Sequence, residues 1–236
     1  MISVIISEEN IGREIIEITD KNDVNHLKNA FRVKVGEVIR VVDGTYEYIC
    51  EILTVEKKII EVKILEKKED EYSTEVEIDA AIGILKNDKM DLTIQKLTEI
   101  GVTRILPLVT KRGVVKLTEK KEKWDLTAKE AIKQCQAVKM MDIREPQKLS
   151  DIDFSKYDLA VVPYECEEDN SLRNILNKLK EKPKRVIYII GPEGGFDTEE
   201  IEFLKSKGVT PVSLGRRILR AETASIIVGG ILVNEF

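Results

Sequence analysis

The chain has few of the residues that build metal centres and disulfide frameworks. Among its 236 residues there is one histidine, His26, and the three cysteines, Cys50, Cys135 and Cys166, form no Cys-x-x-Cys pair. A structural zinc site needs several such ligands close together, and a disulfide scaffold needs a denser set of cysteines. We therefore expect buried, unreactive cysteines and a chemistry that uses Asp, Glu, Arg or Lys side chains without a metal.

Long apolar runs are also absent. No stretch approaches the roughly 18 residues that a membrane helix requires, and the first residues lack a signal-peptide pattern. The 42% apolar and 34% charged residues are typical of a globular chain that buries its core in one large or two small domains. The net charge of −5 argues against a positively charged coat that binds nucleic acid non-specifically. We expect a cytoplasmic protein in which Lys and Arg gather only in local patches.

The usual nucleotide-binding fingerprints are missing where the chain comes nearest to one. Residues 185–196 read RVIYIIGPEGGF, in which an apolar run leads directly into a glycine loop. The spacing matches neither Gly-x-Gly-x-x-Gly nor the P-loop pattern, and Glu193 would repel a phosphate. Asp197 and Glu200 have the spacing of a capping box, so we expect a buried strand, a loop and a helix. Such loops bind ligands beyond the carboxyl ends of parallel strands, and here a neutral or positively charged ligand is favoured.

The hydrophobic pattern changes near residue 70. Short β-branched runs at 38–42, 46–55 and 59–65 predict hairpins of a small β-barrel. A charge run at 66–71 follows, and we place the domain boundary there. Beyond it, we expect strands at 76–85, 103–109, 158–162, 186–190 and 209–213, with helices at 89–99, 118–137, 171–180, 198–207 and from 221 onward. This alternation predicts a parallel sheet with helices on both faces.

Three arginines follow the last expected strand. Arg216, Arg217 and Arg220 lie within five residues, and guanidinium groups suit planar contacts with phosphates or base carbonyls. The alternative is a solvated basic loop. Residues 224–233 carry no charge, so the helix there is expected to be buried on nearly all sides. Its Gly229-Gly230 pair predicts close packing against another helix, from the same sheet or from a second subunit.

These motifs together resemble one known family. Gly-Pro-Glu-Gly-Gly-Phe at 191–196, Leu-Gly-x-x-Ile-Leu-Arg-x-Glu-Thr-Ala at 214–224 and Gln-Lys-x-Thr-Glu-x-Gly-Val at 95–102 are similar to the bacterial small-subunit (16S) ribosomal RNA uridine-N3 methyltransferases of the SPOUT class. The resemblance implies a homodimer in which each chain has a β domain and an α/β domain. A PUA-like β-barrel at 1–70 would dock RNA, and a parallel-sheet SPOUT domain at 71–236 would carry a trefoil knot, an exception to the rule that chains do not thread their own loops.

The resemblance also implies a cofactor, S-adenosylmethionine, held among the knot loops. A loop with Glu193 and a close backbone approach suits adenosine joined to a positively charged sulfonium. The residues carried over by motif, together with the turn after residue 162, are Pro163, Tyr164, Glu165, Gly191, Pro192, Glu193, Gly194, Gly195, Leu214, Gly215, Ile218, Leu219 and Arg220.

The implied reaction is methyl transfer to N3 of a uridine in small-subunit ribosomal RNA or in the 30S subunit. N3 becomes a nucleophile when its proton leaves, so we expect Arg220 to stabilise the charge that spreads onto O2 and O4. Glu222 would accept the proton or stabilise a helix N-terminus. Because N3 lies on the pairing edge, the target must be unpaired or extruded. The candidate phosphate contacts are Lys28, Arg32, Lys89, Lys96, Arg112, Arg216 and Arg217.

Three other functions stay open on the sequence. A nucleotide-dependent α/β enzyme would use the glycine loop for phosphates, although both fingerprints are missing. A non-catalytic RNA-binding protein could retain the same fold. A methyltransferase of the same class with a different RNA target is the third, because the chain has Ala137 and Met141 where the family usually has an Arg and a Pro.

Overall fold

The computed structural model describes residues 1–236, which divide into two compact units. The amino-terminal unit consists of residues Met1–Ser73 together with Ile132–Met140. The carboxyl-terminal unit consists of Thr74–Ala131 together with Met141–Phe236. The division after Ser73 lies next to the charge run at 66–71, and residues 132–140 return to the first unit, which the sequence pattern does not indicate.

The amino-terminal unit is built on a five-stranded mixed sheet in the order β1-β3-β4-β5-β2. Its elements are β1 (Ser3–Ile5), η1 (Glu8–Asn10), β2 (Ile15–Ile18), α1 (Lys21–Asn25), the π-helical turn η2 (His26–Phe31), β3 (Val38–Val42), β4 (Tyr46–Val55) and β5 (Ile60–Glu69). β1 pairs with β3 in parallel, and the other neighbours are antiparallel. The three predicted strands are confirmed. β1 and β2 are too short for a periodic pattern to indicate them.

A buried arginine of β3 connects the sheet of this unit to the segment at 136–137. The Arg40 side chain is 2% exposed and pairs with Glu47 at 3.0 Å. It also donates to the backbone carbonyl oxygens of Gln136 and Ala137, at 2.8 and 3.1 Å. These carbonyls belong to the two residues that follow helix α3 (Glu122–Cys135), so the guanidinium holds the segment after that helix against β3.

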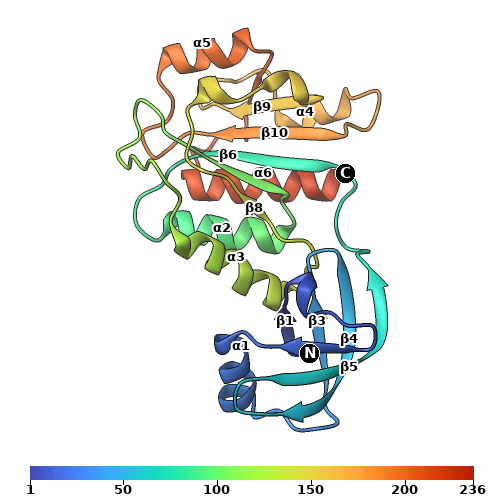
Figure 1. The fold of residues 1–236 in the computed structure, drawn as a ribbon. Helices are drawn as coiled ribbons and strands as arrows, with labels where there is room; N and C mark the ends of the chain where they lie inside the picture. Colours follow the sequence, from blue (N-terminus) through green and yellow to red (C-terminus); the bar gives the residue numbers. More distant parts are fainter. The chain divides into compact units, whose positions relative to one another are not determined.

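The carboxyl-terminal unit contains a six-stranded sheet in the order β11-β9-β10-β6-β7-β8 (Figure 1). The strands are β6 (Glu77–Gly83), β7 (Arg104–Leu108), β8 (Asp142–Ile143), β9 (Leu159–Pro163), β10 (Arg185–Ile190) and β11 (Thr210–Val212). The other elements, besides α3, are α2 (Lys89–Ile100), η3 (Leu149–Asp151), η4 (Phe154–Lys156), α4 (Leu172–Asn177), α5 (Thr198–Ser206) and α6 (Ala221–Glu235). Every strand pair is parallel, as predicted.

Helices cover both faces of this sheet. Ile78, Ala80 and Ile82 of β6 share one core with residues of α2, α3, α4 and α6. Ala81 of the same strand belongs to a second core with α5 and the turns η3 and η4. Alternate residues of a strand point to opposite faces, so the central strands are apolar on both sides.

Gly229 brings α6 close to the sheet and to α2. A Cβ atom at this position would lie 2.9 Å from Tyr188 Oη and 3.0 Å from Leu97 Cδ2, so a larger residue would collide with both. The close packing predicted for the glycine pair is therefore made, for Gly229, against elements of the same chain. A Cβ atom at Gly230 would meet no atom within 4 Å, so the proposed contact of this residue with a second subunit stays a prediction.

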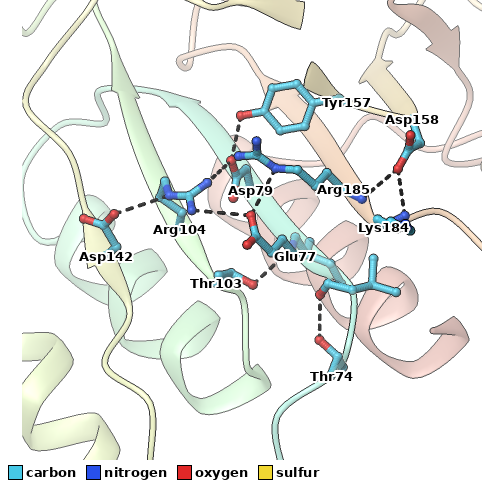
Figure 2. A network of polar contacts seen from close by, with 12 residues as sticks. Thr74, Glu77, Asp79, Thr103, Arg104, Asp142, Tyr157, Asp158, Lys184 and Arg185 are labelled. Atoms are coloured by element: carbon cyan, nitrogen blue, oxygen red, sulfur yellow. Dashed lines mark hydrogen bonds and ion pairs between the residues drawn. The ribbon is translucent and has the colours of Figure 1, made fainter. Parts of the chain in front are cut away.

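The amino ends of the parallel strands carry a connected set of charged side chains, which Figure 2 shows. Asp79 of β6 is fully buried and accepts hydrogen bonds from Arg104 and Tyr157, each at 2.6 Å. Burial raises the pKa of Asp79, and the Tyr157 hydroxyl and the Arg104 guanidinium offset this only in part. Arg104 and Arg185 both pair with Glu77, at 3.6 and 3.0 Å. The charged side chains at this edge of the sheet are thus paired with one another within the chain.

The last part of the chain returns from the sheet edge to its centre. After β11, residues 213–220 run along the carboxyl edge, and α6 then packs against β6 and β10 (Figure 1). The strand order alone does not establish threading, so the trefoil knot stays a prediction. No helix of the chain combines the length and the apolar character needed to cross a membrane.

Candidate active site

Three loops at the carboxyl edge of the parallel sheet enclose a cavity of about 510 Å³. They follow β9, β10 and β11, and the first residues of α2 and α6 complete the wall. Open α/β sheets bind ligands at this edge, and the volume suits a small molecule. The lining residues are Lys89, Pro163, Tyr164, Glu165, Ile190, Gly191, Pro192, Glu193, Gly194, Gly195, Phe196, Ser213, Leu214, Gly215, Arg216, Arg217, Ile218, Leu219, Arg220, Ala221 and Ala224.

All thirteen residues that are expected to hold the cofactor, ten from the motifs and three from the turn after residue 162, line this cavity. They come from three separate stretches, 163–165, 191–195 and 214–220, which only the fold brings together. Their individual roles stay predictions. The motifs did not assign Lys89 to this wall, since it lies about a hundred residues before the glycine loop.

The glycine loop is a tight turn that is anchored through its carboxylate. The N–H of Gly195 donates to the carbonyl of Pro192 at 2.8 Å, and Gly195 adopts a φ of +66°, which favours glycine. Glu193 Oε1 accepts from the N–H of Lys86 at 3.1 Å and lies 3.7 Å from Lys89 Nζ. Burial acts to raise the pKa of Glu193. The backbone N–H groups of Glu193 and Lys86 and the Lys89 ammonium outweigh this effect, so the pKa is lowered below its ordinary value. The carboxylate therefore holds the loop against the start of α2.

The predicted capping box that follows the loop is confirmed. Asp197 accepts from the N–H of Glu199 at 3.1 Å, and the N–H of Asp197 donates to Glu200 Oε2 at 2.8 Å. The other oxygen of Glu200 accepts from the N–H of Lys111 at 2.8 Å, and Arg112 lies 3.7 Å from Asp197. The segment after β7 is thereby fixed to the start of α5, a contact with no local signal in the sequence.

The arginine segment forms a further part of the cavity wall. Arg216, Arg217 and Arg220 line the cavity and are exposed, and none of them has a carboxylate partner. Ile218, between them, is 88% exposed although it is apolar. Three free guanidinium groups beside an open apolar side chain are available to an anionic or planar ligand.

Glu222 lies behind this wall. Its side chain belongs to the first turn of α6 and does not line the cavity. It is 8% exposed, and its Oε1 lies 3.5 Å from the ammonium of Lys89, which does line the cavity. Its Oε2 is buried and has no hydrogen-bond partner. The two residues predicted to be catalytic therefore differ in position. Arg220 lines the cavity, whereas Glu222 does not line it and contacts Lys89, which does.

The remaining candidate phosphate contacts are dispersed. Arg112 donates to the carbonyl of Gly194 at 3.4 Å and so lies beside the glycine loop. Lys96 pairs with Glu99 on α2 at 2.9 Å. Lys28 and Arg32 belong to the amino-terminal unit, where Lys28 donates to the carbonyl of Glu56 at 2.8 Å. Of the seven candidates, the structure brings Lys89, Arg216 and Arg217 to the cavity and Arg112 close to it.

The cysteines follow the expectation only in part. Cys50 is fully buried, and burial raises the pKa of its thiol to about 12. Cys135 is half-buried and Cys166 is exposed, so the predicted burial is wrong for Cys166, which lies in the loop after β9. No group of three or more His, Cys, Asp or Glu side chains is arranged to hold a metal ion.

Known proteins resemble the chain over both units. Residues 72–233 match the family model of an RNA methyltransferase domain, and residues 18–65 match that of an RNA methyltransferase PUA domain. The ribosomal RNA small subunit methyltransferase E of Rickettsia conorii is 32% identical over 89% of this chain and 86% of its own length. The protein of the same name from Bacillus subtilis is 31% identical over 86% of this chain and 84% of its own length.

A solved structure extends the similarity to the whole fold. A methyltransferase of Legionella pneumophila, in complex with its bound cofactor SAM, superposes with a TM-score of 0.84 at 30% identity. The match covers 98% of this chain and 96% of that one. Both the sheet of the amino-terminal unit and the parallel sheet therefore have a counterpart in one solved protein.

Proposed function

Since this chain belongs to the RNA methyltransferase family, we propose that it transfers a methyl group from S-adenosylmethionine to N3 of a uridine in small-subunit ribosomal RNA. The observation that carries the proposal is the cavity, which the thirteen residues expected at the cofactor, from three separated stretches, line together. The relative solved with SAM supports the choice of cofactor. We further propose the assembled 30S subunit as the substrate and the cytoplasm as the location.

The residues of the cavity fit S-adenosylmethionine. Leu214, Ile218 and Leu219 offer apolar surface for an adenine ring. The carboxylates of Glu165 and Glu193 also line the cavity, which suits a ligand with positive charge and disfavours a nucleoside phosphate. When bound there, S-adenosylmethionine supplies an electrophilic methyl group on a sulfonium centre.

We assign the stabilisation of charge on the uridine to Arg220. N3 is a poor nucleophile until its proton leaves and charge spreads onto O2 and O4. Arg220 lines the cavity, is exposed and has no carboxylate partner, so its guanidinium is free to donate to one of these oxygens. A donor placed in advance at a developing anion contributes about 3 kcal/mol to transition-state stabilisation.

Glu222 keeps two alternative roles. As a carboxylate two residues after Arg220, it is a candidate acceptor for the N3 proton, but it lies behind the cavity wall. Its charge in the first turn of α6 also interacts favourably with the helix N-terminus. Loss of N3 methylation in Glu222→Gln with unchanged stability would support proton transfer, and a loss of stability alone would support the second role.

We propose that Arg216 and Arg217 contact RNA phosphates near the cavity, with Arg112 and Lys96 as weaker candidates. Lys28 and Arg32 would supply such contacts from the PUA-like unit. Removal of one side chain that neutralises a phosphate should reduce the slope of log affinity against log salt by about 0.7 to 0.9. Arg216→Ala and Arg217→Ala, compared in RNA binding at several salt concentrations, test this assignment.

We propose a homodimer that packs through the outer face of α6. Ile227 and Ile231, one turn apart, are 39% and 40% exposed, and the neighbouring Gly230 has open space around it. An uncharged helix face with a small residue allows a second helix to approach closely. Light scattering should give twice the chain mass for the wild type and one chain mass for Ile227→Glu. A monomeric wild type would contradict the proposal.

The decisive experiment is methyl transfer from labelled S-adenosylmethionine to small ribosomal subunits that lack modifications, with the product nucleoside identified by mass spectrometry. We expect 3-methyluridine. A different methylated nucleoside would indicate another RNA target. Unlabelled subunits, with S-adenosylhomocysteine and RNA still bound, would indicate a non-catalytic RNA-binding protein. Tighter binding of ATP or NAD than of S-adenosylhomocysteine would favour a nucleotide-dependent enzyme.

A further inference from the structure

Lys89 occupies a position that ordinary helix electrostatics disfavour. It is the first residue of α2, where the partial positive charge of the helix N-terminus repels an ammonium. The N-cap residue, Asp88, makes no side-chain capping hydrogen bond there. A cation at this point is therefore not explained by the helix that carries it, and its partners lie elsewhere.

Those partners are two carboxylates from different elements. Lys89 Nζ lies 3.7 Å from Glu193 Oε1 in the glycine loop and 3.5 Å from Glu222 Oε1 in the first turn of α6. The Lys89 side chain is 36% exposed and lines the cavity. One ammonium thus joins the start of α2, the glycine loop and the start of α6, which are three of the segments that line the cavity or lie next to it.

The carboxylate of Glu222 depends on this contact. Lys89 is its only ion-pair partner, and its second oxygen is buried without a hydrogen bond. A largely buried carboxylate that loses its one cation must move towards water or become less stable in place. Two carboxylates gathered around one ammonium also repel each other once the ammonium is gone. Removal of Lys89 should therefore displace both the glycine loop and the start of α6.

We propose that Lys89 is a positioning residue, whose ammonium holds the glycine loop against the first turn of α6 and so sets Arg220 relative to the cofactor. Arg220 is the N-cap of α6 and lies two residues before Glu222, so a shift of Glu222 moves Arg220 with it. This inference rests on the proposed function for the role of Arg220. It replaces the expectation that Lys89 contacts a phosphate, because its charge is already paired within the chain.

The test compares Lys89→Gln and Lys89→Arg with a matched control. Lys205→Gln removes an ammonium from an ion pair on α5, with Glu202 at 3.0 Å, and neither residue of that pair lines the cavity. In Lys89→Gln we expect kcat to fall about 10- to 100-fold, since small misplacements of catalytic groups have effects of this size. The KM for RNA should stay unchanged. Lys89→Arg should recover part of kcat, because a guanidinium can bridge two carboxylates.

Two readouts do not depend on catalysis. Hydrogen exchange of residues 191–195 in the cofactor-free protein should accelerate in Lys89→Gln and not in Lys205→Gln, because Glu193 loses one of the two contacts that hold the loop. The affinity for S-adenosylhomocysteine, measured by calorimetry, should fall several-fold.

In a double-mutant cycle, Lys89→Gln with Glu222→Gln should lose less kcat than the two single losses combined, since both act through one contact.

Other outcomes would overturn the inference. Unchanged exchange, cofactor affinity and kcat in Lys89→Gln, with weaker RNA binding and a salt slope reduced by about one, would make Lys89 a phosphate contact. Wild-type values throughout would leave it no role. If the wild type methylates no RNA, the proposed function fails, but exchange and cofactor affinity still decide whether Lys89 anchors the loop.

Discussion

The two edges of the parallel sheet use charge in opposite ways. At the amino edge, Glu77, Asp79, Arg104 and Arg185 pair with one another, as Figure 2 shows. At the carboxyl edge, Arg216, Arg217 and Arg220 have no carboxylate partner and face a cavity. Charges that pair within the chain can hold strands together, whereas charges left without partners at a cavity are available to a ligand. The difference separates a structural edge from a functional one.

The two edges also differ in backbone structure, with regular strands at the amino edge and loops at the carboxyl edge. The network at the amino edge is formed largely by residues within or next to the regular strands, such as Asp79 and Arg104. The carboxyl edge is built from loops and helix starts, and Lys89 at the start of α2 connects Glu193 in the glycine loop to Glu222 in the first turn of α6. Loops placed on a rigid sheet can accept a ligand with small adjustments, while the opposite edge keeps the strands in register.

Removing Asp79 should produce the largest effect, and it should fall on stability. Asp79→Ala leaves Arg104 and Tyr157 without their shared acceptor in a buried site, and breaking such a pair costs about 3–5 kcal/mol. Urea unfolding measures this loss. Asp142→Asn, at a partly exposed pair with Arg104, is the control and should cost about 1 kcal/mol or less. A comparable loss in both variants would remove the special role of the buried carboxylate.

Removing Arg220 should produce the converse effect. Arg220→Ala should lower kcat by about 100- to 1000-fold, the loss typical of one donor to a developing anion. The free energy of unfolding should change by about 0.5 kcal/mol or less, because Arg220 is exposed and unpaired. Single-turnover methylation and urea unfolding of the same preparation give both values. A large loss of stability with unchanged kcat would place Arg220 with the structural charges of the other edge.

Local sequence patterns predicted most of the parallel sheet. β10 is an unbroken apolar run, and the helix after it begins at the capping box of Asp197 and Glu200, so both could be assigned from a few neighbouring residues. The short strands β1, β2 and β8 could not, since two to four residues carry too little periodicity. Helix α3 begins at Glu122, later than the predicted 118, because the N–H and side chain of Lys120 bind Glu145 and Asp125 instead.

The site was predictable where motifs are contiguous and not where it depends on distant pairs. The residues 191–195 and 214–220 line the cavity that their motifs indicate. The contact of Lys89 with Glu193 joins residues about a hundred positions apart, and no local pattern signals it. The hydrogen bond that Glu193 Oε1 accepts from the N–H of Lys86 likewise joins distant positions and has no local signal in the sequence. The physical reason is the same in both cases: loop side chains take their partners from whichever strands the sheet places next to them.

The smallest expected effect concerns the pH dependence of stability in acid. The contributions of Asp79 and Glu193 to the free energy of unfolding should change in opposite directions as pH rises. The folded protein holds the proton of Asp79 more tightly than the unfolded chain, whose Asp pKa is near 3.8, so the contribution of Asp79 to stability falls as pH rises from about that value. The folded pKa of Glu193 lies below its ordinary value of 4.5, so its contribution is complete above pH 4.5 and is lost as pH falls below it.

Urea unfolding between pH 3.5 and 6 of the wild type, Asp79→Asn and Glu193→Gln measures these two contributions as differences from the wild type. The stability difference between the wild type and Glu193→Gln should grow as pH rises to about 4.5 and then stay constant. The difference between the wild type and Asp79→Asn should move in the opposite direction over the acid range. If both differences change in the same direction, the buried carboxylate is as well stabilised in its ionised form as the anchored one. The two edges would then differ in what their charges bind and not in how the fold holds those charges.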